Sequence, residues 1–328
     1  MSVSKEKVLV DVDRPLFYEG AMKMLSPVAD LHFQTLTIKS MAEHGDAVAI
    51  IAGAGVMIDD EFLHSAPRLK IVARYGVGYD NVDVEACTGR GVYVTITYDA
   101  LSGTVADLAI CLMLCLSRGI LKADRFAREE WAKHGWGGIL PLGSDLEDKT
   151  LGIVGMGRVG FEVTRRAYGF KMNILYCDIV RREAAERQFG ARRVQLEELL
   201  RESDYVTIHV PLRDETKGLI GRRELSLMKE TAYLINTSRG AVVDQKVLTE
   251  FLKNKRIAGA GLDVFHPEPP QPHDLILQLD NVVLTPHVGS ATHEARRRMS
   301  ISTAKEVLRV LRGERPVNLV PEQVGKIA

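Results

Sequence analysis

The sequence lacks several features that would each indicate a particular class of protein. It has only four cysteines, none in a CxxC pair and none at zinc-ligand spacing from a histidine. Two of them, Cys111 and Cys115, fall in a strongly apolar segment, so we expect buried thiols rather than disulfides. Residues 1–12 contain no apolar segment of the kind found in secretory signals. These absences predict a protein of the cytoplasm.

An excess of charge is also missing. Lys plus Arg and Asp plus Glu both number 43, so the formal net charge is zero. A neutral chain creates no long-range field, which argues against nucleic acid and against anionic membranes as partners. The longest apolar run, 108–116, is far shorter than the roughly 18 residues of a membrane span.

The chain of 328 residues is too long for a single core, because cores stop growing at about 250–300 residues. No internal repeat or low-complexity segment interrupts it. The first hundred residues alternate short β-branched runs with amphipathic segments, which is typical of an α/β protein with a parallel sheet. The expected strands are 7–12, 47–52, 69–74 and 92–96, and the expected helices are 17–25, 59–65 and 82–88.

Residues 102–130 show no strand pattern and predict a helix. Its centre, 108–117, is apolar on every face, so we expect a helix buried all round, between domains or between subunits. The segment 131–148 is expected to be irregular. A second alternating block then predicts strands at 150–154, 173–176, 205–209, 232–235, 259–264 and 282–284, with helices at 158–170, 181–189, 196–202, 222–228 and 244–253. A last long helix, 291–312, needs a surface to pack on, which the first block would supply.

A glycine-rich turn opens the second block. An apolar strand at 151–154 runs into Gly155, Gly157 and Gly160, and a helix follows. In this GxGxxG pattern the first glycine permits the tight turn, the second lets the backbone approach a pyrophosphate, and the third lets the helix lie close to the strand. The free N–H groups at the start of the helix would face the phosphates. The glycines alone are a weak signal, but the flanking strand and helix favour a dinucleotide site.

Asp178 lies at the end of the next predicted strand, at the distance from the glycines expected for a ribose-binding acid. Its carboxylate would accept hydrogen bonds from ribose hydroxyls and repel a 2′-phosphate, which favours NAD(H) over NADP(H). Arg181 and Arg182 leave the choice open, since they either pair with such a phosphate or lie in solvent on the next helix.

Three reactive side chains follow later strands of the second block. Arg239, Glu268 and His287 come after the strands that end near 235, 264 and 284, on the edge where a doubly wound sheet binds its ligands. Histidine can donate a proton to the oxygen of a ketone under hydride attack, and a neighbouring carboxylate would orient the imidazole. Arginine offers a planar fork to a carboxylate or a polarised carbonyl. The set suits reduction of a 2-keto acid.

Each of these residues also has a purely structural interpretation. Arg239 could form a surface ion pair, Glu268 could be an acid of a rigid proline-flanked loop, and His287 could be a hydrogen-bonded core residue. His266, His209 and His293 are competing bases. Of these, His209 lies in an apolar strand and is interpreted as structural, and His266 is expected to face solvent beside Glu268.

With these motifs in order, the sequence resembles the D-isomer-specific 2-hydroxyacid dehydrogenases over nearly its whole length. The resemblance rests on the segments 76–83, 155–160, 236–240, 261–265, 267–269 and 285–290. It implies two Rossmann-like doubly wound parallel-sheet domains: a discontinuous, flavodoxin-like substrate domain at 1–101 and 292–328, and an NAD-binding domain at 102–291. It also implies a homodimer with the apolar helix after residue 102 at the interface.

The resemblance further implies roles for individual residues. Arg239, Glu268 and His287 match the family's catalytic set, and Val77-Gly78 match a loop that binds the substrate carboxylate. The implied cofactor contacts, beyond the glycine turn and Asp178, are Val105, Arg158, Val159, Val210, Pro211, Thr216, Thr237, Ser238, Asp263, His287, Val288 and Gly289. The substrate side chain is expected near Ala54, within the small residues Ala52–Gly55.

Within the family the chain is most similar to the glyoxylate and hydroxypyruvate reductases. The segment Ile51–Gly55 lacks the Arg-Ser pair of phosphoglycerate dehydrogenases, and no C-terminal regulatory domain is visible. We therefore expect an NAD-dependent reductase of a small, unphosphorylated 2-keto acid, with no metal. Two alternatives stay open: a phosphoglycerate dehydrogenase, and an NAD-sensing corepressor on the same fold.

Overall fold

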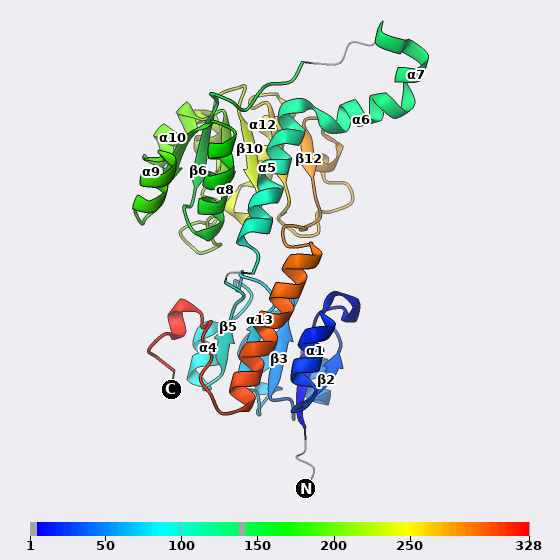
Figure 1. The fold of residues 1–328 in the computed structure, drawn as a ribbon, viewed down its shortest axis with the longest axis vertical. Coiled ribbons are helices and arrows are strands. Elements are labelled where there is room, and N and C mark those ends of the chain that lie inside the picture. Colours follow the sequence, from blue (N-terminus) through cyan, green and yellow to red (C-terminus); the bar gives the residue numbers. More distant parts are fainter. Residues whose placement is uncertain (1–4, 99, 138–141, 328) are drawn as a thin grey trace. The chain divides into compact units, whose positions relative to one another are not determined.

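The computed structural model describes residues 5–98, 100–137 and 142–327. The chain divides into two compact units, Met1–Leu101 with Ser290–Ala328 and Ser102–Gly289 (Figure 1). The second boundary lies two residues before the expected 291/292.

The first unit is built on a five-stranded parallel sheet. Its strands are β1 (Glu6–Val10), β2 (Ala29–Phe33), β3 (Ala49–Ala52), β4 (Ile71–Arg74) and β5 (Tyr93–Thr95), in the order β2-β1-β3-β4-β5. This is the flavodoxin-like order of a doubly wound sheet. The sequence did not indicate β2, because this edge strand carries Asp30 and His32 and is only partly buried.

The helices of this unit are α1 (Glu19–Leu25), α2 (Ile38–Glu43), α3 (Asp60–His64), α4 (Val84–Gly89) and α13 (His293–Leu311). The α2 helix was not predicted. The α2, α3 and α4 helices each begin after a residue whose side chain accepts an N–H of the first turn, namely Thr37, Asp59 and Asp83. The long α13 helix packs on α1 and β4.

The segment after α13 completes the first sheet. The N–H of Ile96 donates to the carbonyl of Asn318, and the N–H of Val320 donates to the carbonyl of Val94, so the segment pairs with the outer edge of β5. The fully buried side chain of Gln323 accepts from the N–H of Val94 at 2.7 Å and donates to the carbonyl of Val92 at 2.8 Å. These bonds explain why two distant parts of the sequence form one unit.

The second unit contains a seven-stranded parallel sheet. Its strands are β6 (Thr150–Val154), β7 (Asn173–Cys177), β8 (Arg192–Arg193), β9 (Tyr205–Ile208), β10 (Tyr233–Asn236), β11 (Gly259–Leu262) and β12 (Val282–Leu284), in the order β12-β11-β10-β9-β6-β7-β8. From β6 the chain continues to β7 and β8 on one side of the sheet. It then returns to β9, on the other side of β6, and continues to β10, β11 and β12. The switch point, where a doubly wound sheet binds its ligand, therefore lies between β6 and β9. The two-residue β8 was not predicted.

Helices cover both faces of this sheet. One face carries α5 (Ser102–Arg118), α8 (Arg158–Gly169) and α9 (Glu183–Phe189), and the other carries α10 (Leu196–Glu202), α11 (Arg222–Leu227) and α12 (Gln245–Lys253). The sequence predicted α8 to α12 to within a few residues and the start of α5 at residue 102. Two further helices, α6 (Ile120–Glu129) and α7 (Trp131–His134), follow α5, and Figure 1 shows them extending away from the sheet of their unit.

The prediction that the α5 helix is buried all round is wrong for the chain by itself. One face, with Val105, Ala109 and Met113, packs on α8 and on strands β10 to β12. Cys111 on the opposite face is exposed and Cys115 is partly exposed, so the expectation of two buried core thiols is also wrong. A sheet covers only one side of a helix, which composition alone cannot reveal.

The expected continuous helix at 102–130 is interrupted at Gly119, whose φ of +58° suits a glycine. The α5 and α6 helices meet there at an angle of 60°. Among the described residues no single helix is long and apolar enough to cross a membrane, and only this bent pair reaches that length together. Residues 138–141 of the segment expected to be irregular lie outside the described residues.

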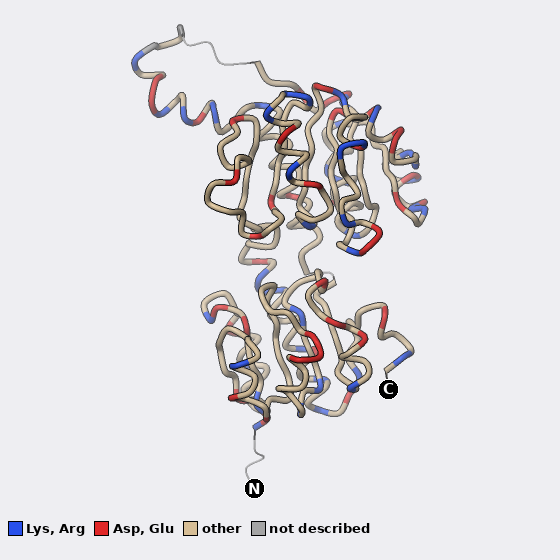
Figure 2. Tube along the Cα trace, turned by 180° about the vertical axis from the view of Figure 1, so that it is seen from behind, with Lys and Arg blue, Asp and Glu red and all other residues tan. Residues whose placement is uncertain are grey.

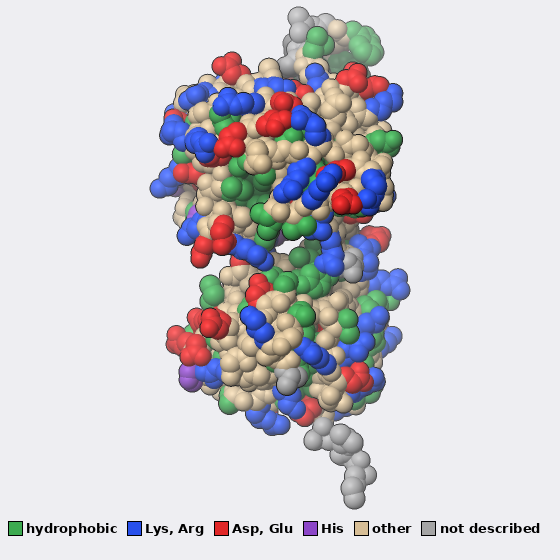
Figure 3. Space-filling view, turned by 90° about the vertical axis from the view of Figure 1, so that its left-hand side faces the viewer, with side chains coloured by type: hydrophobic (Ala, Val, Ile, Leu, Met, Phe, Trp, Pro, Cys, Tyr) green, Lys and Arg blue, Asp and Glu red, His purple; other side chains and the backbone are tan. Residues whose placement is uncertain are grey.

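Charged residues lie mainly on the helices and loops around each sheet (Figure 2). On the face shown in Figure 3, basic and acidic side chains are interspersed. Several oppositely charged side chains of the described residues pair one helical turn apart, as do Glu183 and Arg187 at 2.7 Å.

Candidate active site

The glycine turn after β6 has the geometry that the sequence predicted. Gly155 has a φ of +95°, and a Cβ atom there would lie 2.8 Å from the carbonyl carbon of His209. At Gly160 a Cβ atom would lie 2.2 Å from the carbonyl oxygen of Gly155. A Cβ atom at Gly157 would meet no neighbour within 4 Å. The first and third glycines are therefore required by close packing, whereas the second borders open space at the start of α8.

Asp178 follows β7 and is tied to this turn. Its carboxylate accepts the N–H of Met156 at 2.7 Å and the N–H of Val180 at 2.8 Å. The side chain thus holds the middle of the glycine turn against the end of β7. It remains partly exposed, which leaves its outer lone pairs accessible to a further donor.

The end of β9 supplies the other wall of the switch point. Val210 directly follows His209, and its side chain would lie 2.9 Å from a Cβ atom at Gly155. The hydroxyl of Thr216 donates to the carbonyl of Pro211 at 2.6 Å and accepts the N–H of Arg213 at 2.8 Å. These bonds fold the segment 211–216 into a turn beyond the end of the strand.

The loop after β10 positions Arg239. The side chain of Asn236 donates to the carbonyl of Arg239 at 2.9 Å and accepts the N–H of Ser238 at 3.0 Å. A Cβ atom at Gly240 would lie 2.0 Å from the carbonyl group of Phe265. The missing side chain at Gly240 therefore lets this loop touch the loop after β11, which carries Glu268.

A buried carboxylate fixes the loop after β12. Asp263 is 1% exposed, and it accepts the hydroxyl of Thr285 at 2.7 Å and the N–H groups of Val288 and Gly289 at 2.8 and 2.9 Å. Burial raises the pKa of Asp263, and these hydrogen bonds oppose that rise. A Cβ atom at Gly289 would lie 3.4 Å from Val105 on α5. Asp263 was expected as a cofactor contact. In the structure its carboxylate holds the turn at Val288 and Gly289, directly after His287.

His287 and Glu268 meet at this edge of the sheet. Nδ1 of His287 lies 2.5 Å from Oε1 of Glu268, and the N–H of Phe265 donates to the other carboxylate oxygen at 3.0 Å. Burial raises the pKa of Glu268, but the bonds from His287 and Phe265 and the positive charge of Arg239 outweigh it, so the pKa is lowered overall. The carboxylate is therefore ionised at neutral pH, and Nε2 of His287 is left to carry a proton.

The competing histidines differ in their surroundings. His266 is exposed, and its backbone N–H donates to the side chain of Gln245. Burial lowers the pKa of His209 to about 3, and its Nε2 lies 2.9 Å from the hydroxyl of Thr207. An imidazole that stays neutral at neutral pH cannot donate the proton that a reduction requires. His293 is the first residue of α13 and belongs to the other unit.

The first unit holds the remaining expected substrate residues, in two loops of its own sheet. Ala54 and Gly55 after β3 are exposed, and Val77 and Gly78 follow β4. The guanidinium of Arg74, only 3% exposed, donates to the carbonyls of Ala52 and Gly53 in one loop and of Gly78 in the other. Arg74 thus joins the two loops.

The residues present fit a dinucleotide. The positive-φ turn at Gly155 and the open space at Gly157 leave the start of α8 accessible to a phosphate group. Among the described residues, the buried hydroxyl of Thr237 has no hydrogen-bond partner, which suits a position that a ligand would complete. Thr237 was among the expected cofactor contacts.

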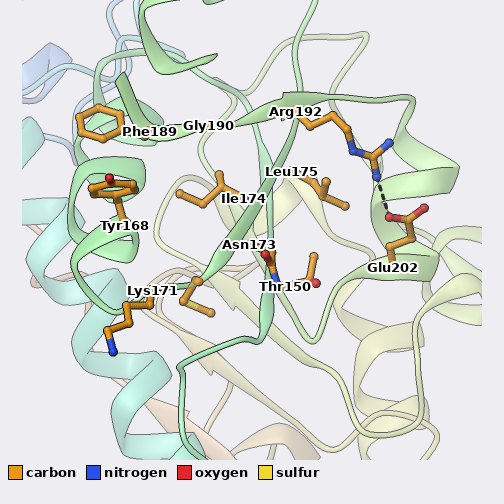
Figure 4. Close-up of a pocket in the computed structure, with 11 residues that line it drawn as sticks. Thr150, Tyr168, Lys171, Asn173, Ile174, Leu175, Phe189, Gly190, Arg192 and Glu202 are labelled. Carbon is orange, nitrogen blue, oxygen red and sulfur yellow. Dashed lines mark hydrogen bonds and ion pairs between the residues drawn. The ribbon is translucent and has the colours of Figure 1, made fainter. Parts of the chain in front are cut away.

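A cavity of about 710 Å³ lies at the opposite edge of the same sheet, at the starts of β6 and β7 (Figure 4). Figure 4 shows Tyr168 and Phe189 on one side and the Arg192–Glu202 ion pair on the other. None of the residues expected to bind cofactor or substrate lines it. In the part of the chain that the structure describes, no group of three or more His, Cys, Asp or Glu side chains could hold a metal ion.

Some positioning residues were not singled out from the sequence. Asn236 and Gly240 lay within a recognised motif, but their contacts depend on two neighbouring loops. Tyr176 and Glu186 form a hydrogen bond of 2.7 Å close to Asp178. The sequence signal for this bond was Tyr176, two residues before Asp178. A tyrosine at this position is equally explained as a buried residue of the strand.

Comparisons with known proteins agree with this geometry. Residues 110–289 match the family model of the D-isomer specific 2-hydroxyacid dehydrogenase, NAD binding domain. The chain is 51% identical over 282 residues to a glyoxylate reductase of Korarchaeum cryptofilum, covering 86% of this chain and 85% of that protein.

Solved structures are similar over nearly the whole length. A glyoxylate reductase from Paecilomyes thermophila has a TM-score of 0.86 and 30% identity, covering 98% of this chain and all of the other. An NADPH-dependent glyoxylate/hydroxypyruvate reductase from Sinorhizobium meliloti, in complex with NADP and malonate, has a TM-score of 0.87 and 31% identity, covering 97% and 98%.

Proposed function

The chain belongs to the D-isomer-specific 2-hydroxyacid dehydrogenases, and we propose that it reduces a small 2-keto acid, glyoxylate or hydroxypyruvate first, with NADH. The observation that carries the proposal is the His287–Glu268 pair, placed beside Arg239 on the sheet edge that also bears the glycine turn. The names of the relatives support this choice of substrate.

In this proposal His287 is the proton donor. Its Nδ1 is bonded to Glu268, so Nε2 holds the proton that passes to the ketone oxygen. The ionised Glu268 stabilises the imidazolium form and fixes the plane of the ring. A nicotinamide cofactor held by the glycine turn and Asp178 would supply the hydride for the reduction.

Arg239 would bind the substrate. The side chain of Asn236 holds the backbone carbonyl of Arg239, and the guanidinium donates to the carbonyl of Ser238 at 2.8 Å. A planar fork of N–H donors can bridge the carboxylate and the ketone oxygen of a 2-keto acid, and it stabilises the negative charge that develops on that oxygen. The backbone N–H groups of Val77 and Gly78 are proposed as further partners of the carboxylate.

An unphosphorylated substrate is the natural choice for the loop that contains Ala54. Ala54 and Gly55 are exposed and small, which leaves room for a substrate side chain. The nearby Arg74 is buried and bonded to backbone carbonyls in this loop, so its donors are turned away from solvent. A phosphoglycerate dehydrogenase would need a cation here for the phosphate.

The cofactor is proposed to be NAD(H), bound by the glycine turn, by Asp178 and by residues that follow β9 to β12, namely Val210, Pro211, Thr216, Thr237, Ser238, Asp263, His287, Val288 and Gly289. The partly exposed carboxylate of Asp178 supports this choice, because it would accept bonds from ribose hydroxyls and repel a 2′-phosphate. Arg158 and Val159, in the first turn of α8, would face the pyrophosphate with their N–H groups.

We propose in addition that the protein is a homodimer of the cytoplasm. Exposed apolar residues on α6 and α7, namely Ile120, Leu121 and Trp131, support a protein partner for this region. All four cysteines are free thiols, which suits a reducing compartment. Sedimentation equilibrium would give twice the monomer mass if the proposal holds, and the monomer mass otherwise.

The proposed reaction is tested by following NADH oxidation with glyoxylate, hydroxypyruvate, pyruvate, phenylpyruvate and 3-phosphohydroxypyruvate. The expected result is turnover with the two small acids first, and its loss in His287→Asn. A preference for 3-phosphohydroxypyruvate would contradict the substrate assignment. A protein that binds NADH but oxidises it with none of these acids would instead be a cofactor-sensing binding protein.

A further inference from the structure

A second cavity, of about 500 Å³, lies between the segment that follows β7, the α9 helix and the edge strand β8. It is lined by Arg181, Glu186, Ala191, Arg192 and Arg193. The guanidinium of Arg193 donates to the carbonyl of Asp178 at 2.8 Å, so the cavity adjoins the residue proposed to bind the ribose. Three guanidinium groups in one cavity would normally attract a phosphate.

Each of these arginines is already engaged. Arg192 pairs with Glu198 at 2.5 Å and with Glu202 at 2.7 Å, and Figure 4 shows its guanidinium turned toward Glu202. Arg193 donates to two backbone carbonyls. Arg181 donates to Glu186 through Nε at 3.0 Å and through a terminal nitrogen at 2.8 Å.

The partners of the Arg181–Glu186 pair are unequally fixed. The hydroxyl of the fully buried Tyr176 donates to Glu186 at 2.7 Å and accepts the N–H of Arg182 at 2.9 Å. The side chain of Glu186 is 19% exposed, whereas that of Arg181 is 64% exposed. The carboxylate is therefore anchored by the core, and the arginine is the partner that can leave.

We propose that Glu186 is a second determinant of cofactor choice, which holds Arg181 in an ion pair and so withholds its guanidinium from a phosphate on the adenosine ribose. The inference rests on the proposed cofactor site. Asp178 would repel the 2′-phosphate directly, and Glu186 would act through Arg181. The same pair would explain how Arg181 can follow the ribose-binding acid in a chain that uses NAD(H).

The energetics favour a measurable effect. An exposed ion pair contributes little, whereas a charge-assisted bond from arginine to phosphate is among the strongest hydrogen bonds in proteins. Replacing Glu186 with Gln keeps an acceptor for Tyr176 and removes the charge that binds Arg181. A ligand with a 2′-phosphate should then bind roughly tenfold more tightly. That factor corresponds to a gain of about 1.4 kcal/mol in the free energy of binding.

The test compares adenosine 2′,5′-bisphosphate with ADP by isothermal titration calorimetry on the full chain. In Glu186→Gln the bisphosphate should bind roughly tenfold more tightly while ADP stays unchanged. The double variant Glu186→Gln/Arg181→Met should lose that gain. The matched control is Glu250→Gln, which breaks the exposed pair with Arg222 and should change neither ligand.

Three results would overturn the inference. The first is an unchanged ratio of the two affinities in Glu186→Gln. The second is a gain that survives the loss of Arg181, which would assign it to another cation. The third is an equal change for both ligands, because Glu186 would then shape the whole nucleotide site. Failure of ADP to bind even the unaltered protein would refute the proposed cofactor site itself, and the inference with it.

Discussion

The imidazole of His287 and the carboxylate of Glu268 lie 2.5 Å apart, although 19 positions separate them in the sequence. They meet because β11 and β12 are neighbours in the sheet and both loops leave its carboxyl edge. The buried Asp263 fixes one loop through Val288 and Gly289, and the Phe265 N–H fixes the carboxylate on the other. This pair gives the first two predictions.

Replacing His287 with Asn should lower kcat by about 10²–10⁴-fold, because the ketone oxygen loses its proton donor. NADH binding, followed by fluorescence, should persist, since the glycine turn is untouched. The control is His266→Asn, which removes an exposed imidazole and should leave turnover near normal. Near-normal turnover in His287→Asn with a loss in His266→Asn would reverse the assignment.

Replacing Glu268 with Gln should move the alkaline limb of the pH profile of kcat/KM to lower pH. The lowered pKa of Glu268 means that its carboxylate is ionised over the working range, and the neutral amide no longer stabilises the imidazolium. Steady-state rates between pH 5 and 9 (roughly the range in which His titrates) check this. A profile that only falls in height, with no shift, would assign Glu268 a purely structural role.

Arg239→Lys should lower kcat/KM strongly, by about 10²-fold or more, because a single ammonium cannot replace a planar fork that bridges two oxygens. The loss should be shared by all 2-keto acids, since each has a carboxylate beside its ketone. Arg213→Lys, on the loop after β9, serves as a control for the loss of a guanidinium. Equal kinetics of Arg239→Lys and the unaltered protein would remove Arg239 from the substrate site.

Gly240→Ala should destabilise the second unit by about 1–3 kcal/mol and lower activity, because the new methyl group would overlap the carbonyl of Phe265. Displacement of that loop would also move Glu268. The control is Gly169→Ala at the end of α8, where a Cβ atom meets no neighbour within 4 Å. Thermal unfolding distinguishes the two, and equal midpoints would show that the loops can separate without cost.

His209 predicts a loss of stability in acid. Burial lowers its pKa to about 3 from 6.5, so below pH 6.5 the unfolded chain binds a proton that the folded chain does not. Stability is therefore retained above 6.5 and falls as the pH approaches 3. His209→Gln, which can still bond Thr207, should reduce this acid loss by up to about 3 kcal/mol at pH 4. Denaturant unfolding at several pH values measures it, and parallel curves for both proteins would contradict the prediction.

Much of this protein follows from the sequence itself. The alternation of apolar strands with amphipathic helices predicted two parallel α/β sheets. The spacing of apolar residues along the sequence differs between strands and helices, so it indicates which of the two a segment forms. Gly155, Gly157 and Gly160 predicted the turn, since only glycine tolerates the backbone angle at the first and the close contact at the third. What the sequence missed were the two-residue strand β8, which has no apolar side chain, and the partly buried edge strand β2, which carries Asp30 and His32.

Only the tertiary structure decided which side chains act on each other. The short distance between His287 and Glu268 depends on the order of β11 and β12 in the sheet, and the contact of Gly240 with Phe265 depends on the same order. Composition placed Cys111 in a core, but the exposed side of α5 depends on which face the sheet covers. The sequence left the state of Arg181 open, whereas in the structure Glu186 holds Arg181 and is itself bonded by Tyr176. Local patterns follow from short-range sterics and burial, whereas these pairings join loops from different strands and helices, and only the folded chain brings those together.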